Sequence, residues 1–104
     1  MHFRDKDKKL LIDNFFKINV PLEVWVYGSR ANGTSHEGSD IDLVIRGNEL
    51  DKFPKKVYYA LKNSIQKSNI PIMVDLFEWH ILPDTFKQNI LQNHEVLYSN
   101  MNGV

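Results

Sequence analysis

The chain has 104 residues, which suffices for one domain with a single hydrophobic core, so we expect residues 1–104 to form one domain. Lys plus Arg number 13 and Asp plus Glu number 13, so the net charge is zero and the broad basic surface of a nucleic-acid-binding protein is missing. The sequence has no cysteine, signal-peptide pattern or long apolar run, which excludes disulfides and thiol catalysis and predicts a cytoplasmic protein without a membrane span.

Hydrophobic periodicity predicts three main helices and three or four strands. Helices are expected over residues 3–18, over the apolar positions from Leu50 to Ile65, and from Pro83 to Asn93. Strands are expected over residues 22–27, 41–45 and 72–77, and residues 94–98 predict an edge strand or a docked tail. This order favours an α/β (α+β) fold, in which a small mixed β-sheet is flanked by helices and the first two strands lie side by side.

The polar loop between the first two strands carries the strongest chemical signal. It begins with Gly28-Ser29 and ends, after residues 30–39, with Asp40-Ile41-Asp42. A glycine directly after a strand lets a phosphate approach the backbone, and Ser29 offers a hydroxyl and an N–H. A short helix over residues 30–32 would add the positive end of its dipole.

The two aspartates of this loop predict a metal site. Residues two apart in a strand project to the same face, so Asp40 and Asp42 can converge on a hard cation such as Mg²⁺. Asp75 is the one charge among the apolar residues of the third expected strand, and burying it without a partner would be costly. It is therefore the natural third ligand, if its strand lies next to residues 41–45.

Each of these features also has an ordinary structural explanation. Gly, Ser and Asp are common turn residues, and Asp75 could instead form a salt bridge. Arg30 either neutralises phosphate charge or pairs with Glu37 on the surface. Ser39 either bonds a phosphate or supports Asp40. The combination of Gly-Ser, Asp-x-Asp and a later lone aspartate favours the functional interpretation over these alternatives.

Several other residues carry a weaker signal. His36 lies in the loop, where a histidine is more often solvated than catalytic, and His80 and His94 have no partner at metal-ligand spacing. Glu78 and Trp79 follow the third strand and could line a cleft. The lysines of the second helix, at positions 55, 56, 62 and 67, are expected to form its solvated face.

The Gly28-Ser29 turn, Asp40, Asp42 and the later Asp75 together resemble the signature of the polymerase β-like nucleotidyltransferase superfamily. The short chain is similar to the minimal nucleotidyltransferase (MNT) group, which consists of little more than the catalytic palm. This resemblance implies that Asp40, Asp42 and Asp75 are the catalytic residues and the ligands of two Mg²⁺ ions. It also implies that Gly28 and Ser29 bind the phosphates of ATP or another nucleoside triphosphate, and we add Arg30 and Ser39 as candidate nucleotide-binding residues.

The resemblance also implies a partner, because a neutral palm has little surface for clamping an acceptor. MNT proteins usually pair with a small helical HEPN protein, as an antitoxin with its toxin. We therefore expect AMP transfer from ATP to a hydroxyl of a partner protein, with homo- or hetero-oligomers left open. The alternatives are an interaction protein that neutralises a toxin by binding alone and a transferase acting on a small-molecule hydroxyl.

Overall fold

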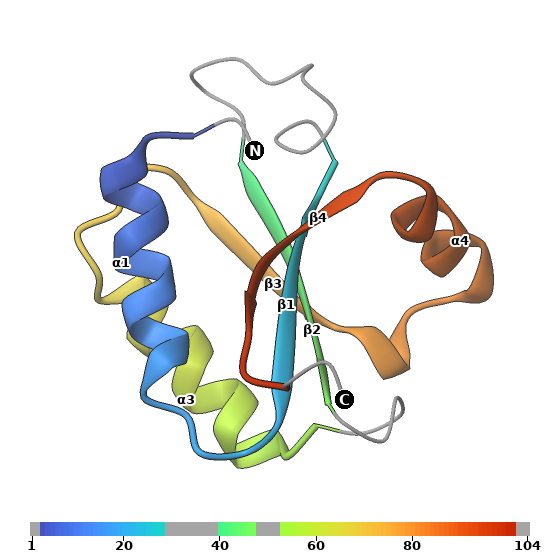
Figure 1. Ribbon diagram of the computed structural model, residues 1–104, viewed down its shortest axis with the longest axis horizontal. Coiled ribbons are helices and arrows are strands. Elements are labelled where there is room, and N and C mark those ends of the chain that lie inside the picture. Colours follow the sequence, from blue (N-terminus) through green and yellow to red (C-terminus); the bar gives the residue numbers. More distant parts are fainter. Residues whose placement is uncertain (1–2, 29–39, 48–52, 102–104) are drawn as a thin grey trace.

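The computed structural model describes residues 3–28, 40–47 and 53–101. Figure 1 shows these elements around a central sheet. In chain order they are α1 (Asp5–Phe16), β1 (Leu22–Tyr27), β2 (Ile41–Gly47), α3 (Lys55–Gln66), β3 (Val74–Glu78), the 3-10 turn η1 (Trp79–Ile81), α4 (Asp84–Gln92) and β4 (His94–Ser99). No helix in these ranges is long and apolar enough to cross a membrane.

The sheet is mixed, as expected from the sequence. Its strand order is β3-β2-β1-β4. β1 pairs antiparallel with both β2 and β4, whereas β2 pairs parallel with β3. The parallel pair needs a crossover connection, and α3 supplies it. Residues 94–99 form an edge strand, which decides between the two interpretations left open for this segment.

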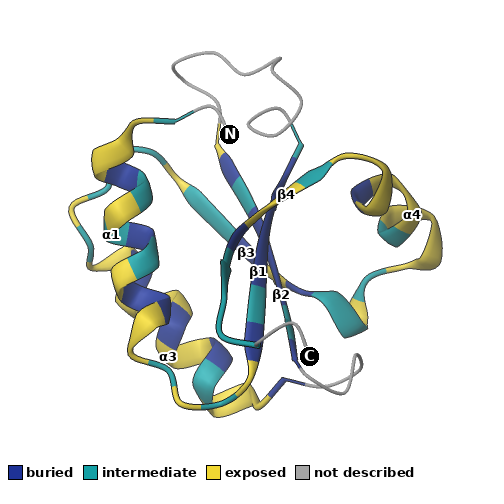
Figure 2. Cartoon of the chain, viewed as in Figure 1, coloured by how far each residue is buried: buried dark blue, intermediate teal, exposed yellow. Residues whose placement is uncertain are grey.

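One face of the sheet packs against α1 and α3 (Figures 1 and 2). Strand residues alternate between the two faces, so every second residue of β1 and β2 enters this core. Its fully buried members include Leu11 and Phe15 of α1, Val24 of β1 and Leu43 of β2. This large cluster holds most of the buried apolar side chains of the described chain and fixes the sheet in position.

The opposite face carries α4 and the η1 turn and has a smaller core. Trp25, Tyr27, Val44 and Ile90 form its buried cluster, with Trp79 packed against it. The indole of Trp25 also stacks on the ring of His94, with 4.1 Å between the ring centroids. His94 therefore has a structural role at the start of β4.

The third strand is shifted and more exposed than its sequence suggests. It spans Val74–Glu78 rather than residues 72–77, and only Leu76 and Glu78 are buried. The greater exposure follows from its position at the edge of the sheet, where β3 has β2 as a neighbour on one side and no strand on the other. The second helix begins at Lys55, with Pro54 at its N-cap, later than the apolar pattern from Leu50 indicated.

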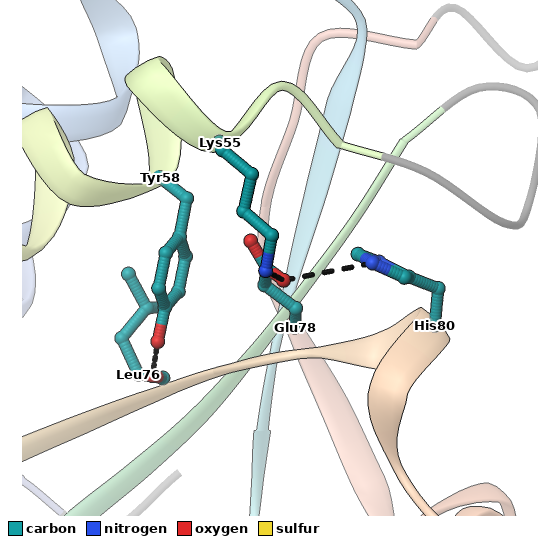
Figure 3. A network of polar contacts seen from close by, with 5 residues as sticks. All are labelled: Lys55, Tyr58, Leu76, Glu78 and His80. Carbon is teal, nitrogen blue, oxygen red and sulfur yellow. Dashed lines mark hydrogen bonds and ion pairs between the residues drawn. The ribbon is translucent and has the colours of Figure 1, made fainter.

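A buried ion pair joins α3 to the end of β3 (Figure 3). The Glu78 side chain is 0% exposed, and its Oε2 accepts a hydrogen bond of 2.9 Å from Lys55 Nζ. His80 Nε2 lies 3.6 Å from the same oxygen, and the hydroxyl of Tyr58 donates to the carbonyl of Leu76 at 2.6 Å. Glu78 is thus a buried strand residue rather than part of an exit loop, and Lys55 does not belong to a purely solvated helix face.

Candidate active site

Two of the predicted metal ligands are neighbours in the sheet. Asp42 on β2 pairs in register with Asp75 on β3. Asp42 lies two residues before Val44, which belongs to the cluster on the α4 face, so both carboxylates emerge on that face. The N–H of Ile41 donates to the carbonyl of Met73 at 2.9 Å and fixes the start of this pairing. The aspartate left unexplained by the apolar sequence of the third strand is thus placed beside Asp42.

Asp40 completes an acidic end of the sheet. It directly precedes β2 and is exposed. Partial burial raises the pKa of Asp42, and the negative charges of Asp75 and Asp40 raise it further. Both neighbouring carboxylates therefore disfavour the charged form of Asp42, and a bound cation would relieve this repulsion.

The hydroxyl of Tyr27 borders the same acidic group. Burial raises the pKa of Tyr27 most, and the charges of Asp42 and Asp75 add to this effect. Tyr27 is paired with Asp42 across the β1–β2 ladder. Tyr27 was not among the site residues predicted from the sequence, although its position in β1, two residues after Trp25, puts it on the same face of the sheet as the site.

The carboxylates of the site are neighbours, but they do not converge on a single position. Across residues 3–28, 40–47 and 53–101, no group of three or more His, Asp or Glu side chains converges tightly enough to hold a metal ion. The donor set still fits Mg²⁺, which prefers carboxylate oxygens and retains water and phosphate ligands. The fit rests on the Asp42–Asp75 register and on the shared electrostatics of the three aspartates.

Gly28 directly follows β1 and lies beside this group. Its φ of +73° lies in the left-handed region, which glycine adopts without a steric penalty. A Cβ added at this position would lie 2.9 Å from Asp42 Oδ2, closer than real Cβ contacts. The missing side chain of Gly28 therefore leaves room for the Asp42 carboxylate as well as for the backbone turn.

The other predicted site residues lie outside the described ranges. These are the nucleotide-binding candidates Ser29, Arg30 and Ser39, the neighbouring loop residues His36 and Glu37, and the short helix expected over residues 30–32. Their assignments remain predictions from the sequence.

Two hollows flank the acidic group. One, of about 290 Å³, lies between the end of β1 and α4 and is lined by Tyr27, Gly28, Phe86, Asn89, Ile90 and Asn93. The other, of about 570 Å³, lies between α3 and β3 and includes Asp75, Met73 and Phe77 in its lining. The sequence patterns did not identify either hollow, because each is formed by elements that are distant in the chain.

Comparison with known proteins places this geometry in a family. Residues 10–102, most of the chain, match the family described as "Polymerase beta, Nucleotidyltransferase". The chain belongs to the polymerase β nucleotidyltransferase family. The resemblance inferred from Gly28-Ser29 and the three aspartates is thereby confirmed at the level of the family.

One curated relative of this chain is a probable protein adenylyltransferase. The chain is 33% identical over 75 residues to the probable protein adenylyltransferase MntA of Haemophilus influenzae, covering 71% of this chain and 63% of that protein. The chain thus spans just under two thirds of the length of this curated relative.

Solved structures establish the fold of this nucleotidyltransferase. It matches a chain from a toxin–antitoxin crystal structure with AMP-PNP at a TM-score of 0.65 and 24% identity, covering 94% of this chain and 76% of that chain. A chain from the tri-AMPylated Shewanella oneidensis HEPN toxin in complex with MNT antitoxin gives a TM-score of 0.64 and 15% identity, covering 93% and 73% respectively. The expected palm-type fold is confirmed by these matches.

Proposed function

We propose that this nucleotidyltransferase transfers AMP from ATP to a hydroxyl on a partner protein, as the antitoxin of a HEPN-type toxin. The observation that carries the proposal is the in-register pairing of Asp42 with Asp75, next to Asp40 and the glycine turn at Gly28. The relatives support the choice of acceptor, since one is a probable protein adenylyltransferase and another structure holds an AMPylated HEPN toxin.

The proposed site assigns a role to each signature residue. Two Mg²⁺ ions would be held by the carboxylates of Asp40, Asp42 and Asp75. When bound, the metal would lower the pKa of the attacking hydroxyl and neutralise the charge of the phosphates, including the pyrophosphate that leaves as the acceptor oxygen bonds to the α-phosphorus. Gly28 and Ser29 would bind the phosphates, with Arg30 and Ser39 as further nucleotide ligands. A carboxylate oxygen of Asp75 would accept or orient the acceptor proton.

The β3 side of the site is the proposed entrance for the acceptor protein. Asp75 lies on an edge strand and lines the hollow of about 570 Å³, together with Met73 and Phe77. These two apolar side chains are 67% and 39% exposed. Exposed apolar side chains next to the Asp75 carboxylate suit a protein surface better than a small polar acceptor.

The test is AMP transfer to a HEPN-type protein, the class of acceptor found AMPylated in a related complex. The chain, that protein, ATP and Mg²⁺ are incubated, and the intact mass of the partner is measured. We expect additions of whole AMP units, abolished by EDTA and by the double substitution Asp40→Asn, Asp42→Asn. Asp13→Asn, an exposed aspartate on α1, is the matched control and should retain full transfer.

The same variants separate modification from binding. If the partner's mass never changes while the double variant still protects cells from the toxin, neutralisation occurs by binding alone and the transfer proposal is wrong. Label appearing on a small-molecule hydroxyl instead would identify the other class of acceptor.

Two further expectations belong to this proposal. A single domain, residues 1–104, carries the whole catalytic set, and the protein acts in the cytoplasm, as the cysteine-free sequence predicts. Fractionation of cells that express the tagged chain would test the location.

A further inference from the structure

We propose that the 290 Å³ hollow between the end of β1 and α4 binds the nucleobase of ATP, with Asn89 and Asn93 as the residues that read its hydrogen-bonding edge. This inference rests on the proposed function and deepens it. It assigns a binding role to α4, which carries none of the signature residues.

The position of the hollow relative to the carboxylates is set by the strand order. Asp75 lies on β3, Asp42 on β2 and Gly28 at the end of β1, so the acidic group and the glycine turn follow one another across the sheet. The hollow continues this line, because Tyr27 and Gly28 form one of its walls and α4 forms the other. A nucleotide with phosphates at Gly28 can therefore extend its nucleoside toward α4.

The α4 wall consists of one helix face. Phe86, Asn89 and Ile90 are spaced i, i+3 and i+4, which places them on the same side of the helix, and the C-cap residue Asn93 extends this wall of the hollow. Phe86 is 40% exposed, and its ring meets the ring of Tyr27 edge-on at 5.9 Å between centroids. The wall thus offers an aromatic and an aliphatic surface to a flat apolar ring.

The two asparagines supply the polar part of this wall. Within the described chain, neither the Asn89 nor the Asn93 side-chain amide makes a hydrogen bond to another residue. Each amide offers both donors and an acceptor. The edge of adenine also combines a donor, its amino group, with ring-nitrogen acceptors. On its N7 edge guanine presents two acceptors instead, so an asparagine that both donates and accepts at this edge favours adenine over guanine.

The charge of the lining favours a base over a phosphate. No Lys or Arg lines the hollow among the described residues, and Asn93 caps the C-terminal end of α4, where the helix dipole is negative. Both features disfavour an anion. The volume is close to the lower limit of about 300 Å³ for small-molecule pockets, which suits part of a nucleotide rather than all of it.

The experiment compares ATP with inorganic tripolyphosphate, which has the phosphates without the nucleoside. Binding of both to the full chain is measured by calorimetry with Mg²⁺, for the wild type and for the double variant Asn89→Leu, Asn93→Leu. We expect the Kd for ATP to rise about ten-fold or more and the preference for ATP over GTP to disappear. The Kd for tripolyphosphate should stay within about two-fold.

The matched control is Gln88→Leu, Gln92→Leu, which makes the same chemical change at exposed amides of α4 outside the hollow. It should bind ATP like the wild type, and thermal melts of all variants confirm that they fold. Unchanged ATP affinity in the asparagine variant overturns the inference, as does an equal loss of tripolyphosphate binding.

Failure of this inference is distinguishable from failure of the proposed function. A wild-type chain that binds ATP with the expected asparagine dependence but never modifies a protein contradicts the proposed function alone. A chain that transfers AMP normally after the asparagine substitutions contradicts the nucleobase site alone. A wild type that binds no ATP overturns both.

Discussion

At the level of single residues, Gly28 is under two separate constraints. Its positive φ disfavours any L-side chain, and a Cβ at this position would force the Asp42 carboxylate to shift. We expect Gly28→Ala to cost about 1–2 kcal/mol of stability from the left-handed backbone alone. Displacement of the Asp42 carboxylate should also lower the rate of AMP transfer, and by much more than the loss of folded protein alone would explain. Urea unfolding and AMP transfer, measured on the same preparation, check both effects.

The raised pKa of Asp42 has a consequence for stability without metal. Because the folded pKa lies above the ordinary value of 3.8, folding favours the protonated form. At pH below the unfolded pKa this group costs no stability. As pH rises through the unfolded pKa and then the folded pKa, the folded state loses stability, and the full cost is present at neutral pH.

We therefore expect Asp42→Asn to stabilise the metal-free protein at pH 7 by a small amount while abolishing transfer. The gain should shrink toward zero near pH 3, where the wild-type carboxyl is protonated in both states. Urea denaturation in EDTA at the two pH values measures it. A variant less stable than the wild type at pH 7 would contradict the prediction and show that Asp42 is stabilised by contacts in the folded chain.

Local chemistry explains which site residues were predictable from the sequence. Asp40, Asp42 and Gly28 stand in one short segment, where alternation and turn chemistry could be applied directly. The role of Tyr27 depends on its pairing with Asp42 across two strands, and that of Phe86 on how α4 docks. Such contacts depend on tertiary packing, which periodicity does not encode.

At the level of secondary-structure elements, α3 is fastened to β3 by the Lys55–Glu78 pair. Glu78 is fully buried, and its Oε1 has no hydrogen-bond partner within the described residues. The carboxylate therefore depends for charge compensation on Lys55, because the nearby His80 is a cation only when it is protonated. Lys55 itself is 58% exposed. Removing it would leave a buried charge without its cation, which is more costly than losing a surface pair.

We expect Lys55→Met to lower the melting temperature by several degrees. Lys56→Met, one residue further along α3 and exposed, is the control and should melt like the wild type. Thermal unfolding followed by circular dichroism compares them. If Glu78→Gln rescues the Lys55→Met variant, the unpaired charge is the cause; if it does not, the lost contacts of the lysine stem are responsible.

Most elements were predictable because their patterns are strong. The apolar runs of β1 and β2 are bounded by turn residues, and α1 and α3 repeat at helical spacing. The errors lie where an element's bounds depend on the element it pairs with. The bounds of β3, for example, are set by its pairing with β2. The Lys55–Glu78 contact shows the same limit, because a lysine in a charged helix gives no sign of a buried partner.

At the level of the whole molecule, the two faces of the sheet are unequally supported. The α1–α3 face holds the large core cluster, whereas α4 is held by the four buried residues of the smaller one. Segments with few buried apolar contacts open locally without global unfolding. The proposed nucleobase site thus lies on the less stable layer.

We expect the amides of α4 to exchange with deuterium faster than those of β1 and β2, and to be protected by ATP with Mg²⁺. Native-state hydrogen exchange followed by mass spectrometry measures both. Amides of α3, on the opposite face, should respond little to the nucleotide. Exchange of α4 at the same rate as β1 would instead indicate that the domain unfolds as one cooperative unit.

The parallel pairing of β2 with β3 also determines when the site forms during folding. β1 and β2 pair antiparallel, but Asp75 reaches Asp42 only after α3 has carried the chain back across the sheet. Contacts between residues distant in sequence pay a larger loop-closure entropy and form slowly. A newly made chain would therefore gain its helices before its carboxylate pair, and the ability to bind a metal would follow the formation of α3.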